Sequence, residues 1–349
     1  MGVLHPDAFK LTDADKQHFL EHGYIKVSGC FPPEAAEEFT ANLWTRLGMS
    51  PTDKSTWTKE RTNMPYHTHT LAADFAPKAW SAICQLLAPE DGGEQEGDER
   101  ISGGDDDKWR SWSDGFIVNL GTPESEKKDI DNMDEDARLR NAGVWHVDGD
   151  FFVHYLDSPE QALLVIPLFT DIQSKGGATY ENPAGLTPWF KPTDDATETR
   201  EFFEALSADK DKLPTSSLVE ATGKIGDVYL MHPLTLHSAS ENLLRIPRVI
   251  TNPPVVLREP FNFDREDGRY SLVERKTLRE LGMEGGLKGW AIEGGRRGWV
   301  SERMKRMEGG TEGGEGRGWG GKGELEWVVI VLVRKEKLVF TAVEEDTAN

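Results

Sequence analysis

Hydrophobic residues recur at helical spacing in four segments of the chain, and three of these segments precede residue 90. Thr12 or Asp13 can cap the first helix, and Gly23 follows its last turn, where a left-handed residue commonly ends a helix. The second helix begins at prolines and ends at a glycine, which is the usual asymmetry of helix ends. The pattern predicts helices over 12–22, 32–48, 77–89 and 271–282.

Between about 112 and 260 the pattern changes to the alternation and short apolar runs that are typical of β-strands. Turn-rich pieces such as "SKGGATYENPAGLTP" separate these runs. Successive strands joined by such turns predict a β-sandwich or a barrel, and a helical N-terminal part over about 10–90 would buttress it. The expected strands are 115–121, 143–156, 162–172, 225–240 and 247–257.

Two polar stretches and one glycine-rich stretch interrupt these elements. The acidic segment 90–108 and the polar segment 125–141 are expected to be solvated loops. The segment from about 284 to 323 is low in complexity and predicts a mobile insertion, which strand-like pieces follow at 324–333 and 337–343. Because no internal repeat divides the chain, we expect one domain over residues 1–349.

The charge of the chain narrows the classes of partner. Its formal net charge is −21, with 61 acidic and 40 basic side chains. Nucleic acids and anionic membrane surfaces both require a basic face, so neither is an expected partner. Cys30 and Cys84 are too few for a disulfide framework and fit a reducing compartment. The N-terminus lacks the apolar core of a signal peptide, and no apolar run has the length of a membrane span. These features predict a cytoplasmic protein.

Candidate chemistry begins in "GVWHVDGDFFVHYL", residues 143–156, where His146 and Asp148 stand among apolar and aromatic residues. Their i, i+2 spacing places both side chains on one face of a strand, close enough to bind one ion. A neutral imidazole with a carboxylate suits a divalent transition metal. An H-x-D pair alone arises by chance in many chains, and a metal site usually needs a third protein ligand. We therefore expect a second imidazole from another strand.

The segment "GDVYLMHPLTLHSAS" offers two further histidines, His232 and His237. They are five positions apart and would point to opposite faces of a regular strand, so at most one can reach the metal, although Pro233 could introduce a bulge. Arg248, eleven positions after His237, would return beside it on a neighbouring strand. A buried guanidinium close to a metal is best explained by a small dicarboxylate, which it holds in bidentate fashion.

Two classes of function fit only part of this set of residues. A non-catalytic barrel that binds a ligand would have no need for the arginine, and a zinc hydrolase at the same triad would not explain it. His67 and His69 form an H-x-H pair without a third ligand nearby in sequence, so we expect a loop near the mouth of the site. His232 is expected to be a structural histidine, and Arg245 a solvated turn residue.

The set of two histidines, one aspartate and one arginine resembles the phytanoyl-CoA dioxygenase family of Fe(II)/2-oxoglutarate oxygenases. The shared pattern is H-x-D, then about 90 residues, then a histidine with an arginine eleven positions later. "HPLTLHSAS" is similar to the HPLxxH strand of that family, whose second histidine is the ligand, which favours His237 over His232. "GGATYENPAG" and "LTDADKQHFLEHGYIKVSG" also resemble family segments. The likeness covers most of 10–260 and is strongest to a fungal branch of small-molecule enzymes.

The resemblance implies a fold and a metal centre. The fold would be mainly β with flanking α: a double-stranded β-helix, or cupin-like jelly roll, over about 112–260, with the helices of 10–90 against it. Fe(II) would be bound by His146, Asp148 and His237. Because the halogenating relatives lack the carboxylate ligand, the presence of Asp148 argues against a halogenase.

The resemblance also implies a cosubstrate, an oxidant and a substrate class. The distal carboxylate of 2-oxoglutarate would pair with Arg248, helped by the hydroxyl of Ser238 or Ser240, and Asn119 would be a further polar contact. With O2 as the oxidant, 2-oxoglutarate would yield succinate and CO2. The reaction would hydroxylate, desaturate or cyclise a small molecule, such as an amino acid or a related compound of fungal secondary metabolism. The oligomeric state is not predicted.

Overall fold

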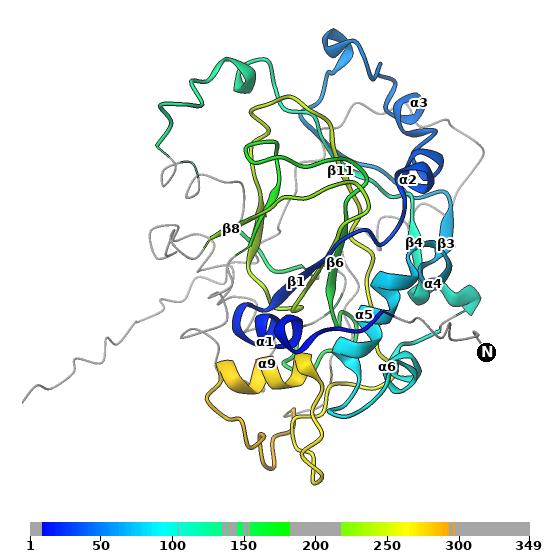
Figure 1. The fold of residues 1–349 in the computed structure, drawn as a ribbon, viewed down its shortest axis with the longest axis vertical. Helices are drawn as coiled ribbons and strands as arrows, with labels where there is room; N and C mark the ends of the chain where they lie inside the picture. The colour runs from blue at the N-terminus through cyan, green and yellow to red at the C-terminus, as the bar shows by residue number, and fades with distance from the viewer. Residues whose placement is uncertain are drawn as a thin grey trace, which may run out of the picture. The chain divides into compact units, whose positions relative to one another are not determined.

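The strands of the chain, in its computed structural model, lie in two layers with helices packed on the outer face of one layer (Figure 1). The structure describes residues 9–103, 105–134, 138, 145–148, 152, 154–181, 218–292 and 296. All of them belong to the unit Met1–Ser301. The two strand-like pieces near the C-terminus and most of the glycine-rich segment lie outside the described residues, and a single domain over the whole chain stays a prediction.

Helix α1, Asp13–His22, begins and ends where its sequence predicts. The Thr12 hydroxyl accepts a hydrogen bond from the Asp15 N–H at 3.1 Å, and the Asp15 carboxylate accepts one from the Thr12 N–H at 2.9 Å. These two bonds complete a capping box. Gly23 ends the helix in the left-handed conformation, with φ of 77°. Strand β1, Tyr24–Val27, follows directly.

The predicted helix over 32–48 is two short helices, α2 (Pro33–Phe39) and α3 (Leu43–Leu47). Between them the N–H and the hydroxyl of Thr40 both donate to the Ala36 carbonyl, at 2.9 and 2.7 Å. The Leu43 N–H then bonds to Thr40 O at 2.8 Å, three residues back instead of four. A threonine hydroxyl that bonds to the backbone competes with the regular ladder, so the prediction of one continuous helix was wrong.

The other two predicted helices are confirmed as α5 (Pro77–Leu87) and α9 (Leu272–Glu280). Helix α9 has its own capping box, between Ser271 and Glu274. Within the described part of the chain, no helix combines the length and the apolar character needed to cross a membrane. Among the described residues, the further helical elements are α4 (Ala72–Phe75), α6 (Glu94–Arg100), and the 3₁₀ turns η1 (Lys54–Thr56), η2 (Asp105–Arg110) and η3 (Ser125–Lys127).

Helix α6 overturns the prediction that 90–108 is a solvated loop. Gly97 of α6 lies so close to α5 that a Cβ atom there would be 1.8 Å from the Cys84 carbonyl oxygen. The Trp80 indole on α5 donates to the Asp98 carboxylate of α6 at 3.0 Å. Gly97 therefore permits two helices to pack closely, and the acidic side chains around it form specific contacts.

The strands after β1 are short and pair in antiparallel fashion. Several of the longer segments predicted as strands contribute only a few of their residues. The bounds are β2 (Arg61–Asn63), β3 (His69–Leu71), β4 (Ser111–Ser113), β5 (Ile117–Asn119), β6 (Leu164–Pro167), β7 (Thr179–Glu181), β8 (Val219–Ala221), β9 (Val228–Met231), β10 (His237–Ala239) and β11 (Arg248–Ile250).

One layer contains two three-stranded sheets, β1-β9-β6 and β11-β5-β2. A bridge between Leu168 and Ile250 joins these sheets, next to a 2.9 Å hydrogen bond from the Phe169 N–H to Val249 O. The facing layer is β10-β7-β8, and β3 with β4 forms a separate ribbon. Alternate residues of the first layer face opposite ways, toward the helices or toward the second layer.

Two apolar clusters follow from this alternation. Val165, Leu230 and Val249 belong to the large cluster that includes the helices. The residues next to them belong to a smaller cluster between the layers, which contains Leu164, Ile166, Leu168, Ile172, Ala178, Ala221, Tyr229, Met231 and Ile250. The predicted fold class, a mainly β jelly-roll core buttressed by helices, is confirmed in this form. Within the described residues the strands do not close into a barrel.

Two predicted strands are shorter or more broken than expected. The segment 225–240 contains β9 and β10, separated by a turn in which the Thr235 N–H bonds to His232 O at 2.9 Å. The described residues of 143–156 contain no strand, and only His146 forms a β-bridge. Strand parity between His232 and His237 therefore does not apply, because the two histidines are not on one strand.

Candidate metal centre

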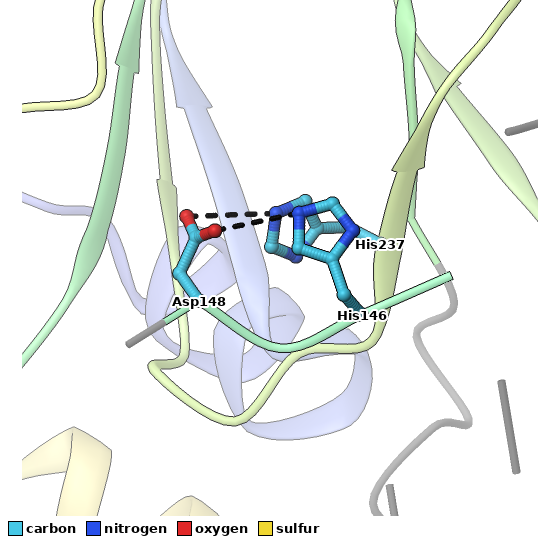
Figure 2. Close-up of side chains that lie close together, drawn as sticks. All are labelled: His146, Asp148 and His237. Atoms are coloured by element: carbon cyan, nitrogen blue, oxygen red, sulfur yellow. Dashed lines mark ion pairs between the residues drawn. The ribbon is translucent and has the colours of Figure 1, made fainter. Parts of the chain in front are cut away.

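His146 and His237 come from segments far apart in the chain and face each other as an antiparallel pair. Each backbone N–H donates to the carbonyl of the other residue, both at 2.9 Å. Directly paired residues project their side chains from the same face, and the two imidazole centroids are 4.4 Å apart (Figure 2). The His237 side chain is buried, whereas that of His146 is 45% exposed, so the pair is open to solvent on the His146 side.

The Asp148 carboxylate points toward both imidazoles (Figure 2). Its Oδ1 lies 3.4 Å from Nε2 of His146, and its Oδ2 lies 3.6 Å from Nε2 of His237. Burial raises the pKa of Asp148, but His237 and His146 together outweigh burial and hold the pKa well below its usual value. The carboxylate is therefore ionised at neutral pH, which is the form that binds a metal.

The backbone fixes which nitrogen of His237 faces the aspartate. Nδ1 of His237 lies 3.0 Å from the carbonyl oxygen of Thr235, which can only accept a hydrogen bond. Nδ1 thus carries a proton, and Nε2, the atom that faces Asp148, is the nitrogen that can bind a metal. A backbone carbonyl holding the second ring nitrogen is the usual arrangement of a metal-binding histidine.

The structure brings the three residues together as a group that can hold a metal. One possible ligand atom from each of His146, Asp148 and His237 lies within 4.8 Å of the others. Two imidazole nitrogens with one carboxylate oxygen suit a divalent transition metal, and iron in oxygenases uses this set with open positions. Elsewhere in the described ranges no other three His, Cys, Asp or Glu side chains meet in this way, and His67 and His69 form no such group.

Arg248 supplies a buried positive charge between the layers. Arg248 is 3% exposed, and its Nη2 donates a 2.6 Å hydrogen bond to the Thr179 hydroxyl on β7. Its Nε has no hydrogen-bond partner, and no carboxylate of the described residues pairs with it. Burial, together with the nearby Arg61, lowers the pKa of Arg248 to about 9. Since this guanidinium lacks a counter-charge among the described residues, an anionic ligand would be a suitable partner for it.

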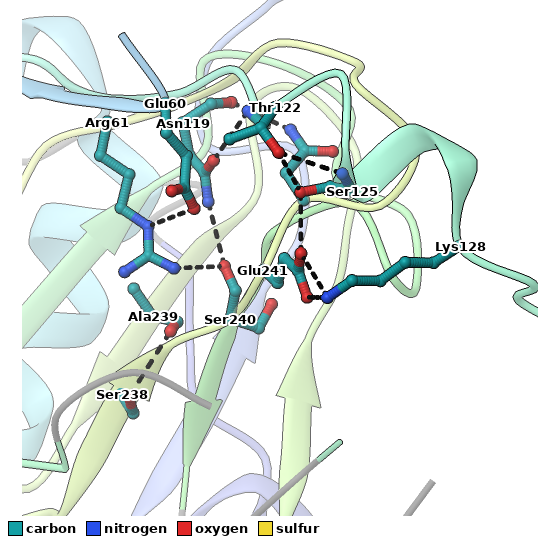
Figure 3. A network of polar contacts seen from close by, with 12 residues as sticks. Glu60, Arg61, Asn119, Thr122, Ser125, Lys128, Ser238, Ala239, Ser240 and Glu241 are labelled. Atoms are coloured by element: carbon teal, nitrogen blue, oxygen red, sulfur yellow. Dashed lines mark hydrogen bonds and ion pairs between the residues drawn. The ribbon is translucent and has the colours of Figure 1, made fainter. Parts of the chain in front are cut away.

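Arg61, Asn119 and Arg248 are direct neighbours across β2, β5 and β11. Nδ2 of Asn119 donates to Ser240 O at 3.0 Å, and Nη2 of Arg61 donates to the same oxygen at 3.1 Å (Figure 3). The side-chain Oδ1 of Asn119 also accepts a hydrogen bond from the Gly121 N–H at 3.2 Å. These bonds connect β5 to the end of β10, and a contact between Asn119 and a cosubstrate stays a prediction.

The two serines predicted beside Arg248 occupy different positions. Ser238 alternates with His237 along β10 and therefore lies on the opposite face, where its hydroxyl is 3.5 Å from Ala239 O. The Ser240 hydroxyl is buried without a hydrogen-bond partner among the described residues. The hydroxyl that does contact Arg248 belongs to Thr179, which the sequence analysis did not single out.

A network of charged residues fixes the loop that follows β10 (Figure 3). The Glu241 carboxylate accepts hydrogen bonds from Ser125 at 2.8 Å and from Lys128 at 2.6 Å. Further along this loop, Arg245 pairs with Glu126 at 3.1 Å and is buried. The prediction that Arg245 is a solvated turn residue was therefore wrong, because its guanidinium anchors the turn to η3.

His232 is a structural histidine, as predicted. It is fully buried, and its Nε2 donates to the Thr277 hydroxyl of α9 at 2.8 Å, since that hydroxyl already donates to Val273 O. Its Nδ1 accepts the Leu234 N–H at 3.2 Å. Burial, with Lys276 nearby, lowers the pKa of His232 to about 3, so the ring is neutral. Both nitrogens are used in the turn between β9 and β10, and neither is available to a metal.

Asn252 is a second residue that the sequence analysis missed. Its side-chain amide donates to Oδ2 of Asp148. The sequence carries a weak signal for it, since Asn252 follows Arg248 by four positions and shares its strand parity. Without knowledge of which segment faces β11, that signal does not identify the partner.

No protein-family model matches the chain, and no curated protein does. Similar solved structures include SnoK, a non-heme alpha-ketoglutarate-dependent carbocyclase from nogalamycin biosynthesis, with 15% identity over 69% of this chain and 82% of that chain and a TM-score of 0.36. HygX from Streptomyces hygroscopicus, with nickel, 2-oxoglutarate and hygromycin B bound, has 12% identity over 69% and 85% and a TM-score of 0.38. The non-heme monooxygenase ThoJ has 13% identity over 71% and 80% and a TM-score of 0.40. At these scores the likenesses carry no argument about this chain.

Proposed function

We propose that the protein is an Fe(II)- and 2-oxoglutarate-dependent oxygenase that oxidises a small molecule, on the pattern of the phytanoyl-CoA dioxygenase family. The observation that carries the proposal is the combination of the His146, Asp148 and His237 group with a buried arginine that has no acidic partner among the described residues. Either feature alone occurs in proteins of other functions. Together they provide for a metal and for a dicarboxylate.

Arg248 is the stronger discriminator. A buried charge without a counter-ion costs several kcal/mol on the order-of-magnitude scale for ion desolvation, so its retention needs a reason. A carboxylate from a ligand would supply two oxygens for the fork of the guanidinium, of which Nε is unpartnered. Thr179, already bonded to Nη2, holds the guanidinium in place and can itself share a ligand oxygen. The Ser240 hydroxyl is a further candidate donor.

Different residues of the chain would bind the metal and orient the cosubstrate. His146, Asp148 and His237 would hold Fe(II), which when bound with 2-oxoglutarate and O2 couples oxidative decarboxylation of the cosubstrate to oxidation of the substrate. Three protein ligands leave positions for exogenous ligands. Arg248 would bind the far carboxylate and so orient the cosubstrate between the two layers. The exposed side of His146 is the direction from which a substrate would approach.

Two competing functions give different expectations. A zinc hydrolase could use the same three ligands, but it would leave Arg248 unexplained and would consume no 2-oxoglutarate. A non-catalytic ligand-binding barrel would have no need of a metal. The net charge of −21 favours a substrate without phosphates, and we propose a low-molecular-weight compound of secondary metabolism, such as an amino acid derivative.

Succinate formation tests the proposal. The purified chain is supplied with Fe(II), 2-oxoglutarate and O2, with and without a pool of small metabolites. We expect succinate that depends on iron and is lost in His237→Ala. The matched control is His22→Ala, which removes an exposed imidazole of α1 and should leave the rate unchanged. Absence of succinate under every condition, with no binding of 2-oxoglutarate, would contradict the proposal and favour the binding-protein alternative.

A further inference from the structure

We infer that Asn252 is a positioning residue for the Asp148 carboxylate and dictates that this aspartate binds a metal through one oxygen. The inference rests on the metal site of the proposed function, but not on the identity of the cosubstrate. The side-chain hydrogen bond of Asn252 is with Asp148, and not with a metal, a cosubstrate or a substrate. Its effect would pass through Asp148.

The contact between the two side chains is directional. Nδ2 of Asn252 donates to Oδ2 of Asp148. An ionised carboxylate can only accept hydrogen bonds, so the amide must present its NH2 end to Asp148. The Asp148 side chain is only 21% exposed, and Asn252 is half-buried, so water competes weakly for this bond. A hydrogen bond to a charged acceptor in such surroundings is among the stronger ones in proteins.

The backbone of Asn252 is held by its place after β11. Arg248 and Asn252 are four positions apart, about 13 Å along an extended chain, and face the same side. Beyond the strand the chain keeps the alternation of an extended segment, since Asn252, Pro254 and Val256 are half-buried while the residues between them are buried. Pro253 also restricts the preceding residue to extended conformations. The amide is thus presented from a restrained backbone.

The consequence lies in the two carboxylate oxygens. Oδ2 accepts the Asn252 amide and lies 3.6 Å from Nε2 of His237. Oδ1 lies 3.4 Å from Nε2 of His146, on the side of the pair that is open to solvent. The amide therefore makes Oδ2 the weaker ligand and leaves Oδ1 for the metal. An aspartate bound through a single oxygen uses one coordination position instead of two.

Metal binding by the full chain tests this inference. The dissociation constant for Mn(II) is measured by calorimetry for the wild type, Asn252→Ala and Asn252→Leu, the last of which preserves side-chain size without a donor. The matched control is Asn132→Ala, because the Asn132 amide also donates to an aspartate, Asp129, at 2.7 Å, on the exposed surface. Infrared spectra of the Mn(II)-loaded proteins report whether a carboxylate binds through one or two oxygens.

We expect Mn(II) binding to weaken about 10- to 100-fold in both Asn252 variants, as is typical when support of a metal ligand is removed. The control should bind as the wild type does, and the carboxylate bands should shift toward two-oxygen binding only in the Asn252 variants. If the Asn252 variants bind Mn(II) within twofold of the wild type with unchanged spectra, the inference is overturned while the metal site stands. If the wild type itself binds no Mn(II), both this inference and the proposed function fail.

Discussion

Arg248 and Thr179 join the two layers of strands through a 2.6 Å hydrogen bond between side chains. Arg248 comes from β11, in the layer that packs on the helices, and Thr179 comes from β7, in the facing layer. The bond thus places an arginine of one layer at a fixed point against the other. Thr179 carries no charge, so the guanidinium has no negative partner among the described residues.

Replacement of Arg248 should separate ligand binding from stability. Arg248→Met should weaken 2-oxoglutarate binding by about 2 to 4 kcal/mol, on the order of 30- to 1000-fold, because a buried charge pair with the ligand is lost. The same change should not lower the melting temperature of the ligand-free protein, since replacing an unpaired buried charge by an apolar side chain removes its desolvation cost. Calorimetric titration and thermal unfolding measure the two effects.

Thr179→Val is a second test of the same binding site, through the residue that holds the Arg248 guanidinium. It keeps the shape of the side chain and removes the hydroxyl, so it should weaken 2-oxoglutarate binding by about 1 to 3 kcal/mol through the loosened guanidinium. Mn(II) binding should be unchanged in both variants, because neither residue is in the metal group. Equal affinity of Arg248→Met and the wild type for 2-oxoglutarate would show that the arginine has another purpose.

The three metal-binding candidates should behave as one unit. His146→Ala, Asp148→Asn and His237→Ala should each weaken Mn(II) binding by more than the roughly 10- to 100-fold that is typical of losing a supporting residue. His232→Gln should leave Mn(II) binding intact, because both nitrogens of His232 are engaged in hydrogen bonds of the turn. Loss of binding in His232→Gln, together with retained binding in His237→Ala, would reverse the assignment of the ligand.

His232 should make the metal-free protein sensitive to mild acid. Its pKa is about 3 in the folded state and about 6.5 when unfolded, so between these values the unfolded chain binds the extra proton. Stability from this group is complete above pH 6.5 and falls as the pH drops below it, by about 2 kcal/mol between pH 7.5 and 5. Urea unfolding at these two pH values should show a smaller decrease for His232→Gln than for the wild type. An equal decrease would exclude His232 as the source.

Gly97→Ala should destabilise the helical part of the protein. The added Cβ would lie 1.8 Å from Cys84 O, which forces α6 away from α5 and should cost about 1 to 3 kcal/mol or more. Gly285→Ala is the control, because a Cβ there meets nothing within 4 Å and the backbone is not in the left-handed region. The free energies of unfolding of both variants give the comparison. A Gly97→Ala protein as stable as its control would mean that the two helices can separate freely.

Features with local causes were predictable from the sequence. The cap at Thr12 and the end of α1 at Gly23 depend on residues within a few positions, and the structure has both of them. The break at Thr40 was not predicted, because a threonine within a helical pattern can either continue the helix or bond to its backbone. Gly97 is likewise compatible with two structures, a loop or a close contact between helices, and only the position of α5 decides between them.

The site divides in the same way. His146, Asp148 and His237 could be selected from spacing and family resemblance, and the structure brings them together. Thr179 and Asn252 could not, because their importance comes from which strand faces which, and that depends on the pairing of segments distant in the sequence. Threonine and asparagine are common in strands and turns, so the residue types alone do not indicate these roles.

The backbone pair between His146 and His237 links the lifetime of the metal centre to that of the β-bridge. The two imidazoles are neighbours only while both 2.9 Å backbone bonds exist, and these bonds close a loop of about 90 residues. A partly folded chain that lacks this bridge has no site to offer, so metal binding requires that this contact between distant segments has formed. In the folded protein, the rate of hydrogen–deuterium exchange at these two amides should report how often the bridge opens. Bound metal should lower the exchange rates of both amides together.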